Sequence, residues 1–156
     1  MPKKGVGMEI LIDNQQNRRS IPSAELKKTA MAILNALDCH DGELSLLIVD
    51  DKNMASLNET YRGRSGPTNV LSFAMNEGAF GDVVPHLLGD VVISVETCRR
   101  EAESTGISFE RHFDELLVHG ILHLFGFDHE QSEAEEDRMR AKSEELLEFL
   151  DRRRES

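Results

Sequence analysis

One segment near the end of the chain, HGILHLFGFDH from His119 to His129, constrains the fold more than any other stretch. His119 and His123 are four residues apart, so on a helix their imidazoles lie one turn apart on the same side. Gly126 predicts the end of that helix, because glycine accepts the left-handed conformation of a C-terminal cap. After this turn the chain can double back and bring His129 to the same point. We therefore expect a central, buried helix with three imidazoles gathered at its end.

Three neutral imidazoles that meet at one point form the protein part of a catalytic zinc site, whose fourth position is left to water. The spacing follows the zinc-protease pattern H-E-x-x-H-x-x-G-x-x-H in its histidines and its glycine. Gly120 replaces the glutamate that serves those proteases as general base. We predict one Zn²⁺ per chain, held by His119, His123 and His129. For Gly120 we expect close packing against a neighbouring strand, with open space left beside the metal.

Hydrophobic periodicity predicts four strands and about five helices along the 156 residues. A helix that Pro22-Ser23 opens separates the first two strands, and such a crossover favours a parallel, right-handed pair. We therefore expect a single α+β domain, residues 1–156, with three layers, one mixed four-stranded sheet and a central zinc-binding helix. The expected strands are 8–12, 43–50, 70–73 and 88–94. The second helix is capped by Asp50 or Asp51 and carries Met54, Leu57 and Tyr61 on its apolar face. The later helices are expected from Ser94 to Gly106, from near Ser108, and over about 133–150, the last followed by a frayed Arg152–Arg154.

The formal net charge of −11 argues against a long, non-specific contact with nucleic acid. Arg62 and Arg64 are the only basic residues between Asn53 and Cys98, and this small basic spot suits a few selected phosphates. No apolar run of about 18 residues exists, so no membrane span is expected, and the N-terminus lacks an apolar signal core. We expect a cytoplasmic location, in which Cys39 and Cys98 stay reduced.

Three stretches follow the motifs of one family. The histidine segment matches H-G-x-L-H-L-x-G-[YF]-D-H, and residues 57–73 resemble L-N-x-x-Y-R-G…P-T-[DN]-V-L-S-F. Residues 88–94 resemble L-G-D-I-V-I-S, with valine in place of the first isoleucine. On these motifs, which extend over roughly half of the chain, the sequence resembles the YbeY family of bacterial rRNA maturation factors. Ser65, Ala74 and Phe127 stand where Asp, Pro and Tyr are common in the family. We assign no role to Ser65 or Phe127.

The resemblance implies a zincin-like fold and a zinc-dependent, single-strand-specific endoribonuclease. Such proteins act in 3′-end maturation of 16S rRNA and in ribosome quality control, so the implied partners are single-stranded rRNA and the small ribosomal subunit. His119, His123 and His129 carry over as zinc ligands, and the important arginine of the family carries over as Arg62. The oligomeric state stays open.

Phosphodiester cleavage builds negative charge on the non-bridging oxygens, and a planar guanidinium can hold two of them at once. From the residues alone, Arg62 is equally a surface arginine at a helix C-terminus; the resemblance favours the catalytic role. Two mechanisms stay open, attack by zinc-activated hydroxide and attack by the ribose 2′-OH. Asp128 is expected both to orient His129 and to stabilise the turn, and His112 is expected to be solvated.

Two other functions remain as alternatives. A metallopeptidase, or another small-substrate hydrolase, is compatible with the three histidines but lacks the glutamate at position 120. A non-catalytic ribosome assembly factor would use zinc structurally, and a structural site is closed by a fourth protein ligand. His112 and Asp128 are the candidates for that ligand. We rank the nuclease first, the assembly factor second and the peptidase third.

Overall fold

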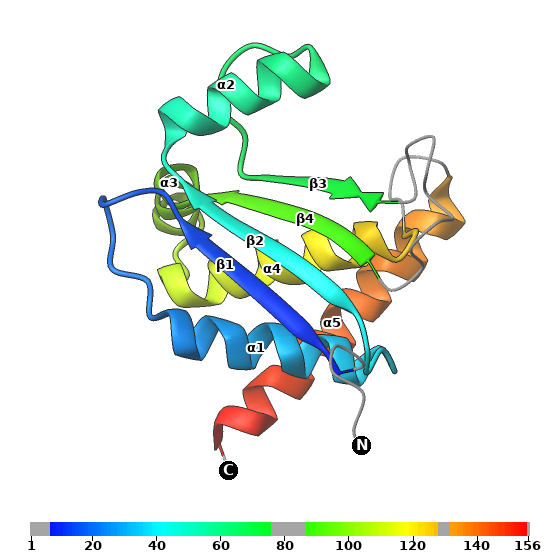
Figure 1. The fold of residues 1–156 in the computed structure, drawn as a ribbon. Coiled ribbons are helices and arrows are strands. Elements are labelled where there is room, and N and C mark those ends of the chain that lie inside the picture. Colours follow the sequence, from blue (N-terminus) through cyan, green and yellow to red (C-terminus); the bar gives the residue numbers. More distant parts are fainter. Residues whose placement is uncertain (1–6, 76–86, 128–131, 156) are drawn as a thin grey trace.

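The computed structural model describes residues 7–75, 87–127 and 132–155 (Figure 1). These residues form one mixed four-stranded sheet and five helices, which confirms the predicted α+β class. None of the described helices combines the length and the apolar composition that crossing a membrane requires. The elements are β1 (Glu9–Asn14), α1 (Ser23–Ala36), β2 (Glu43–Val49), α2 (Asp51–Arg62), β3 (Val70–Ala74), β4 (Leu87–Ser94), α3 (Val95–Thr105), α4 (Phe109–Leu124) and α5 (Glu133–Glu155).

The sheet has the strand order β1-β2-β4-β3. β1 and β2 are parallel, as the crossover through α1 predicts, and β2 pairs with β4 in the same direction. β3 runs antiparallel to β4 at the edge of the sheet. β1 extends two residues beyond its predicted end, because its ladder with β2 continues to the pair Asn14–Ile48 although Asp13 and Asn14 are polar.

Alternate residues of the inner strands point to opposite faces of the sheet. On one face, Leu44, Leu46 and Ile48 join Val91 and Ile93 in the main core. α1 and α4 cover this face, and α5 packs against both helices from outside (Figure 1). α4, which carries the histidine pair, is therefore enclosed between the sheet and α5.

A second, smaller core lies on the other face of the sheet. Val49, Leu71 and Val92 meet Met54 of α2 there, with Leu57 and Phe73 packed at its margin. On this second face of β2 only Val49, at the end of the strand, is buried, while Ser45 and Leu47 are half-buried. The prediction from its apolar run, a strand covered on both faces, is therefore correct only for the end of β2. The prediction for Tyr61 is wrong: its side chain does not continue the buried face of α2 and is 63% exposed, because the small core ends before the last turn of that helix.

Local capping chemistry sets most helix ends. The side chains of Asp50, Ser94 and Ser108 accept a backbone N–H in the first turns of α2, α3 and α4. Gly63 and Gly106 end α2 and α3 in the left-handed conformation, at φ 66° and 76°.

The predicted end of α5 is wrong. The helix continues from the predicted last residue, Leu150, to Glu155, and the arginines expected to fray are helical. Arg154 forms an ion pair with the carboxylate of Asp114 on α4, and its Nη2 also donates to Thr29 Oγ1 on α1 at 3.1 Å. The side chain of Asp114 is only 9% exposed, so this ion pair fastens the last turn of α5 to both inner helices.

Candidate metal centre

The histidine pair lies in the last two turns of α4. Nε2 of His119 and Nε2 of His123 are 3.1 Å apart, and the two ring centroids are separated by 4.6 Å. Two nitrogen ligands of a tetrahedral zinc ion, each at about 2.0–2.1 Å from the metal, lie about 3.3 Å from each other. The spacing of the two Nε2 atoms therefore fits a pair of ligands to one zinc ion.

The third predicted ligand, His129, and its neighbour Asp128 lie outside the described residues, so their roles stay predictions. The turn that leads toward them is described. α4 ends at Leu124, and Gly126 takes a φ of 92°, as its predicted role at the end of the helix requires. In the described ranges no group of three His, Cys, Asp or Glu side chains is placed to hold a metal.

Gly120, the residue after His119, packs directly against the sheet. A Cβ at this position would lie 2.6 Å from Val91 Cγ1 and 3.2 Å from both Ser72 Oγ and Val70 Cγ2. The predicted close packing is confirmed. The space into which a side chain at position 120 would project is occupied by β3 and β4, so it is not open as predicted. A glutamate side chain at position 120 would have to enter the sheet.

Arg62, the predicted catalytic arginine, is the last residue of α2. Its Nη2 donates to the carbonyl oxygen of Ser72 at 2.5 Å, and its guanidinium carbon lies 4.7 Å from the centroid of the Phe73 ring. Ser72 Oγ in turn donates to the carbonyl oxygen of Gly120 at 2.8 Å. Ser72, to which the sequence assigned no role, therefore connects the arginine to the helix that carries the histidines. One such bond uses a single one of the five N–H donors of a guanidinium, so others remain for a phosphate.

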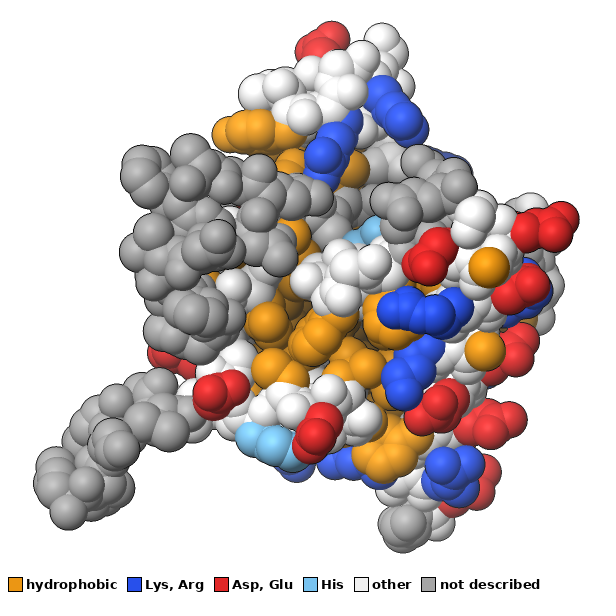
Figure 2. Space-filling view, turned by 90° about the vertical axis from the view of Figure 1, so that its right-hand side faces the viewer, with side chains coloured by type: hydrophobic (Ala, Val, Ile, Leu, Met, Phe, Trp, Pro, Cys, Tyr) orange, Lys and Arg blue, Asp and Glu red, His pale blue; other side chains and the backbone are white. Residues whose placement is uncertain are grey.

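Figure 2 shows one face of the molecule with two histidine side chains in view, of which the one nearer the centre is set back from the surface. Lys and Arg side chains stand on the segment above it. Over the part of the chain that the structure describes, Arg62 and Arg64 remain the only basic residues between positions 53 and 98. This local basic character contrasts with the net charge of −11.

His112 is not the solvated residue that we predicted. Its Nε2 lies 2.7 Å from Glu101 Oε1 of α3, its Nδ1 lies 2.8 Å from Glu115 Oε1, and its side chain is 15% exposed. Burial lowers the pKa of His112, but the hydrogen bonds to the two carboxylates outweigh burial and leave the pKa above its usual value. With both ring nitrogens engaged two turns away from His119, about 10 Å along the helix, His112 is not available as a fourth zinc ligand.

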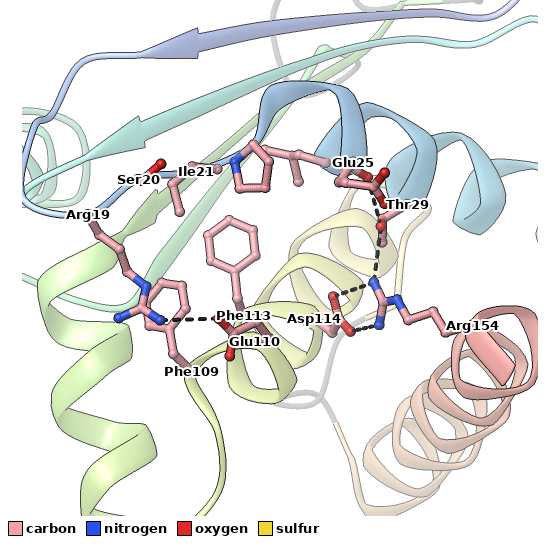
Figure 3. Close-up of a pocket in the computed structure, with 12 residues that line it drawn as sticks. Arg19, Ser20, Ile21, Glu25, Thr29, Phe109, Glu110, Phe113, Asp114 and Arg154 are labelled. Carbon is pink, nitrogen blue, oxygen red and sulfur yellow. Dashed lines mark hydrogen bonds and ion pairs between the residues drawn. The ribbon is translucent and has the colours of Figure 1, made fainter.

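A separate pocket of about 120 Å³ lies at the other end of α4 (Figure 3). Phe109 and Phe113 line it, and the guanidinium of Arg19 stacks 3.7 Å above the ring of Phe109. Its deepest charge, the carboxylate of Asp114, is already neutralised by Arg154. Because both arginines of this pocket are already paired, Arg19 with Glu110 and Arg154 with Asp114, we assign it no part in catalysis.

Both cysteines are free thiols, as predicted. Burial raises the pKa of Cys98 to about 12, and burial also raises the pKa of Cys39. The thiolate is the form that binds metals and attacks electrophiles, so neither residue supplies a reactive group at neutral pH.

Comparison with known proteins gives consistent matches along the chain. The family model described as "Endoribonuclease YbeY" matches residues 11–151. Endoribonuclease YbeY of Geobacter sulfurreducens is 48% identical over 145 residues, which cover 92% of this chain and 97% of the relative. The protein of the same name from Geobacter metallireducens is 48% identical over 146 residues, covering 93% and 97%.

A solved structure shares the fold. The solution structure of the Thermotoga maritima protein TM1509 superposes with a TM-score of 0.64 at 25% sequence identity, covering 89% of this chain and 87% of that chain. Sequence and fold thus agree over nearly the whole length.

Proposed function

The chain belongs to the Endoribonuclease YbeY family, and on that premise we propose that it is a zinc-dependent endoribonuclease specific for single-stranded RNA. Its zincin-like site would act in the cytoplasm on rRNA of the small ribosomal subunit, in 3′-end maturation of 16S rRNA and in ribosome quality control. The observation that carries the proposal is the pair of histidine Nε2 atoms 3.1 Å apart on α4, which lies within the residues that the family model matches.

His119, His123 and His129 would hold the zinc ion, and none of them is then free to act as general base. When bound, zinc lowers the pKa of a coordinated water and draws electron density from a phosphate oxygen. The chain's own contribution is to fix the imidazoles: α4 lies between the sheet and α5, and Gly120 seats it on β3 and β4.

Arg62 would bind the phosphate at the scissile bond. Its hydrogen bond to the Ser72 carbonyl and its position over the ring of Phe73 hold the guanidinium in place before substrate arrives. A preorganised cation stabilises the charge that develops on the phosphate oxygens without reorganising during the reaction.

The structure weakens both alternatives. A peptidase would need a carboxylate at position 120, where Val91 and Ser72 leave no room for one. A closed structural zinc site would need a fourth ligand, and His112 is engaged by Glu101 and Glu115. Asp128, which lies outside the described residues, remains the other candidate for that ligand.

The test is incubation of zinc-loaded protein with an RNA fragment from the 3′ end of 16S rRNA. Arg62→Glu and His119→Ala are expected to slow cleavage by about 100-fold or more, because each removes a group that acts on the reacting phosphate. Arg99→Glu on α3 is the matched control, since it makes the same change in net charge at an exposed arginine and should leave the rate unchanged. Equal cleavage by all proteins would indicate a contaminating nuclease and remove the catalytic assignment.

The ends of the products distinguish the two mechanisms left open. Products with a 2′,3′-cyclic phosphate would show attack by the ribose 2′-OH and exclude direct attack by hydroxide.

A further inference from the structure

Tyr61 is the only tyrosine of the chain, which contains no tryptophan. It lies in the last turn of α2, directly before Arg62, and 63% of its surface is exposed. A large aromatic side chain so exposed beside a basic residue needs a reason, since the small core under α2 is complete without it.

The ring of Tyr61 has a defined position. Its centroid lies 5.6 Å from that of Phe73, and the planes meet at 68°, an edge-to-face contact. Phe73 is itself held by the small core on one side and lies beneath the guanidinium of Arg62. An edge-to-face contact occupies at most one face of the Tyr61 ring. At least one face is therefore open to a flat partner, while Phe73 keeps the ring from rotating freely.

Hydrogen bonds link the neighbouring residue, Arg62, to the helix that carries the histidine pair. Arg62 donates to the carbonyl oxygen of Ser72, and Ser72 Oγ donates to the carbonyl oxygen of Gly120, which follows His119. The open ring thus lies one residue from the arginine that is joined through β3 to the metal-binding helix.

We propose that Tyr61, supported by Phe73, is a stacking platform for one unpaired base of the RNA, next to the phosphate that Arg62 binds. Adjacent aromatic and guanidinium groups match a single strand, which offers a base face and a phosphate within one nucleotide. A base within a duplex is already stacked on both faces, so the platform selects single-stranded RNA. This inference rests on the proposed endoribonuclease function and assigns a residue to its strand specificity.

The test uses the zinc-loaded full chain and a single-stranded RNA whose riboses are 2′-O-methylated, with electrophoresis to check that the strand stays intact. Because Tyr61 is the only tyrosine and tryptophan is absent, fluorescence excited at a wavelength that phenylalanine does not absorb reports on this ring alone. Stacking should quench it. Anisotropy of a labelled strand should show affinity about 5- to 30-fold weaker for Tyr61→Leu, and unchanged for Tyr61→Phe, which keeps the ring.

Two controls make the result specific. Leu11→Ala removes another exposed apolar side chain, 48% exposed on the opposite edge strand, and should bind RNA as the wild type does. Strands with a single abasic site, moved along the sequence, should reveal one position at which the wild type loses affinity and Tyr61→Leu does not.

Absence of quenching, or equal affinity for Tyr61→Leu and the wild type, would overturn the inference. An equal loss for Leu11→Ala would also overturn it, by showing non-specific adhesion. Failure of the proposed function is a separate result: no cleavage of unmodified RNA by wild-type protein, whatever the binding data show.

Discussion

Gly120→Ala tests whether close packing sets the position of the metal-binding helix. In most helices, replacing glycine by alanine stabilises the helix, because the helix propensity of alanine is about 1 kcal/mol more favourable than that of glycine. Here the new methyl group would lie 2.6 Å from Val91 Cγ1, a separation that requires movement. Val91 is fully buried in β4, so it has little room to yield.

Overpacking of a well-packed core costs about 1–3 kcal/mol, and a clash this close belongs in the upper part of that range. When the gain in helix propensity is subtracted from this cost, Gly120→Ala should destabilise the protein by about 1–2 kcal/mol. For a chain of this size, the melting temperature should fall by about 2–8 °C. Urea unfolding at neutral pH, followed by circular dichroism, measures the same quantity.

The second mutation Val91→Ala supplies the control, because it removes the nearest of the three atoms that the new methyl group would meet. In that background, Gly120→Ala should be close to neutral or should stabilise by up to about 1 kcal/mol. A rise in stability for Gly120→Ala alone would refute the packing argument. It would also reopen the peptidase alternative, since position 120 would then accept a side chain.

The remaining predictions concern charged groups outside the metal centre. Arg154→Gln should destabilise the protein by about 1–2 kcal/mol, since it leaves the buried carboxylate of Asp114 without its cation, a loss reduced by the exposure of the arginine. Arg153→Gln, an exposed neighbour in the same turn, should change stability by less than about 0.5 kcal/mol, and equal losses would contradict the ion-pair argument. The pKa of His112 is higher in the folded protein than in the unfolded chain. Protonated His112 therefore stabilises the folded protein fully at a pH below the ordinary histidine pKa, and this contribution is lost as the pH rises through the raised pKa of the folded protein. The difference in melting temperature between wild type and His112→Gln should therefore shrink from weakly acidic to alkaline pH, and a constant difference would exclude the charged pairing. Burial raises the pKa of Asp51, but the hydrogen bonds that its carboxylate accepts outweigh burial and hold the pKa below its usual value. The contribution of ionised Asp51 to the stability of the folded protein is therefore lost as the pH falls through this lowered pKa. Urea titrations should accordingly show a smaller effect of Asp51→Asn in strong acid than at neutral pH, and a larger effect in acid would reverse the assignment.

Features set by neighbouring residues in the chain could be predicted from sequence. The caps at Asp50, Ser94 and Ser108 depend on a side-chain oxygen that reaches N–H groups of the next turn. The spacing of His119 and His123 likewise places two imidazoles together on any regular helix.

Three features set by distant segments were predicted wrongly. α5 continues past Leu150 because Arg154 finds a carboxylate on α4, and no local pattern reveals that partner. His112 is held away from solvent by a hydrogen bond to Glu101 on α3, a partner that the local sequence does not reveal either. Tyr61 is exposed because the small core ends beneath it, which depends on how α2 lies on the sheet. Each error arises where tertiary contacts outweigh local propensity.

The most direct test of the account is titration of metal-free protein with Zn²⁺ while cleavage of a single-stranded RNA is measured. We expect the rate to rise with added zinc and to reach its plateau at one equivalent per chain. His123→Ala should show no such rise over the same range. Cleavage that persists unchanged after zinc has been removed completely, or that responds equally in His123→Ala, would contradict the account.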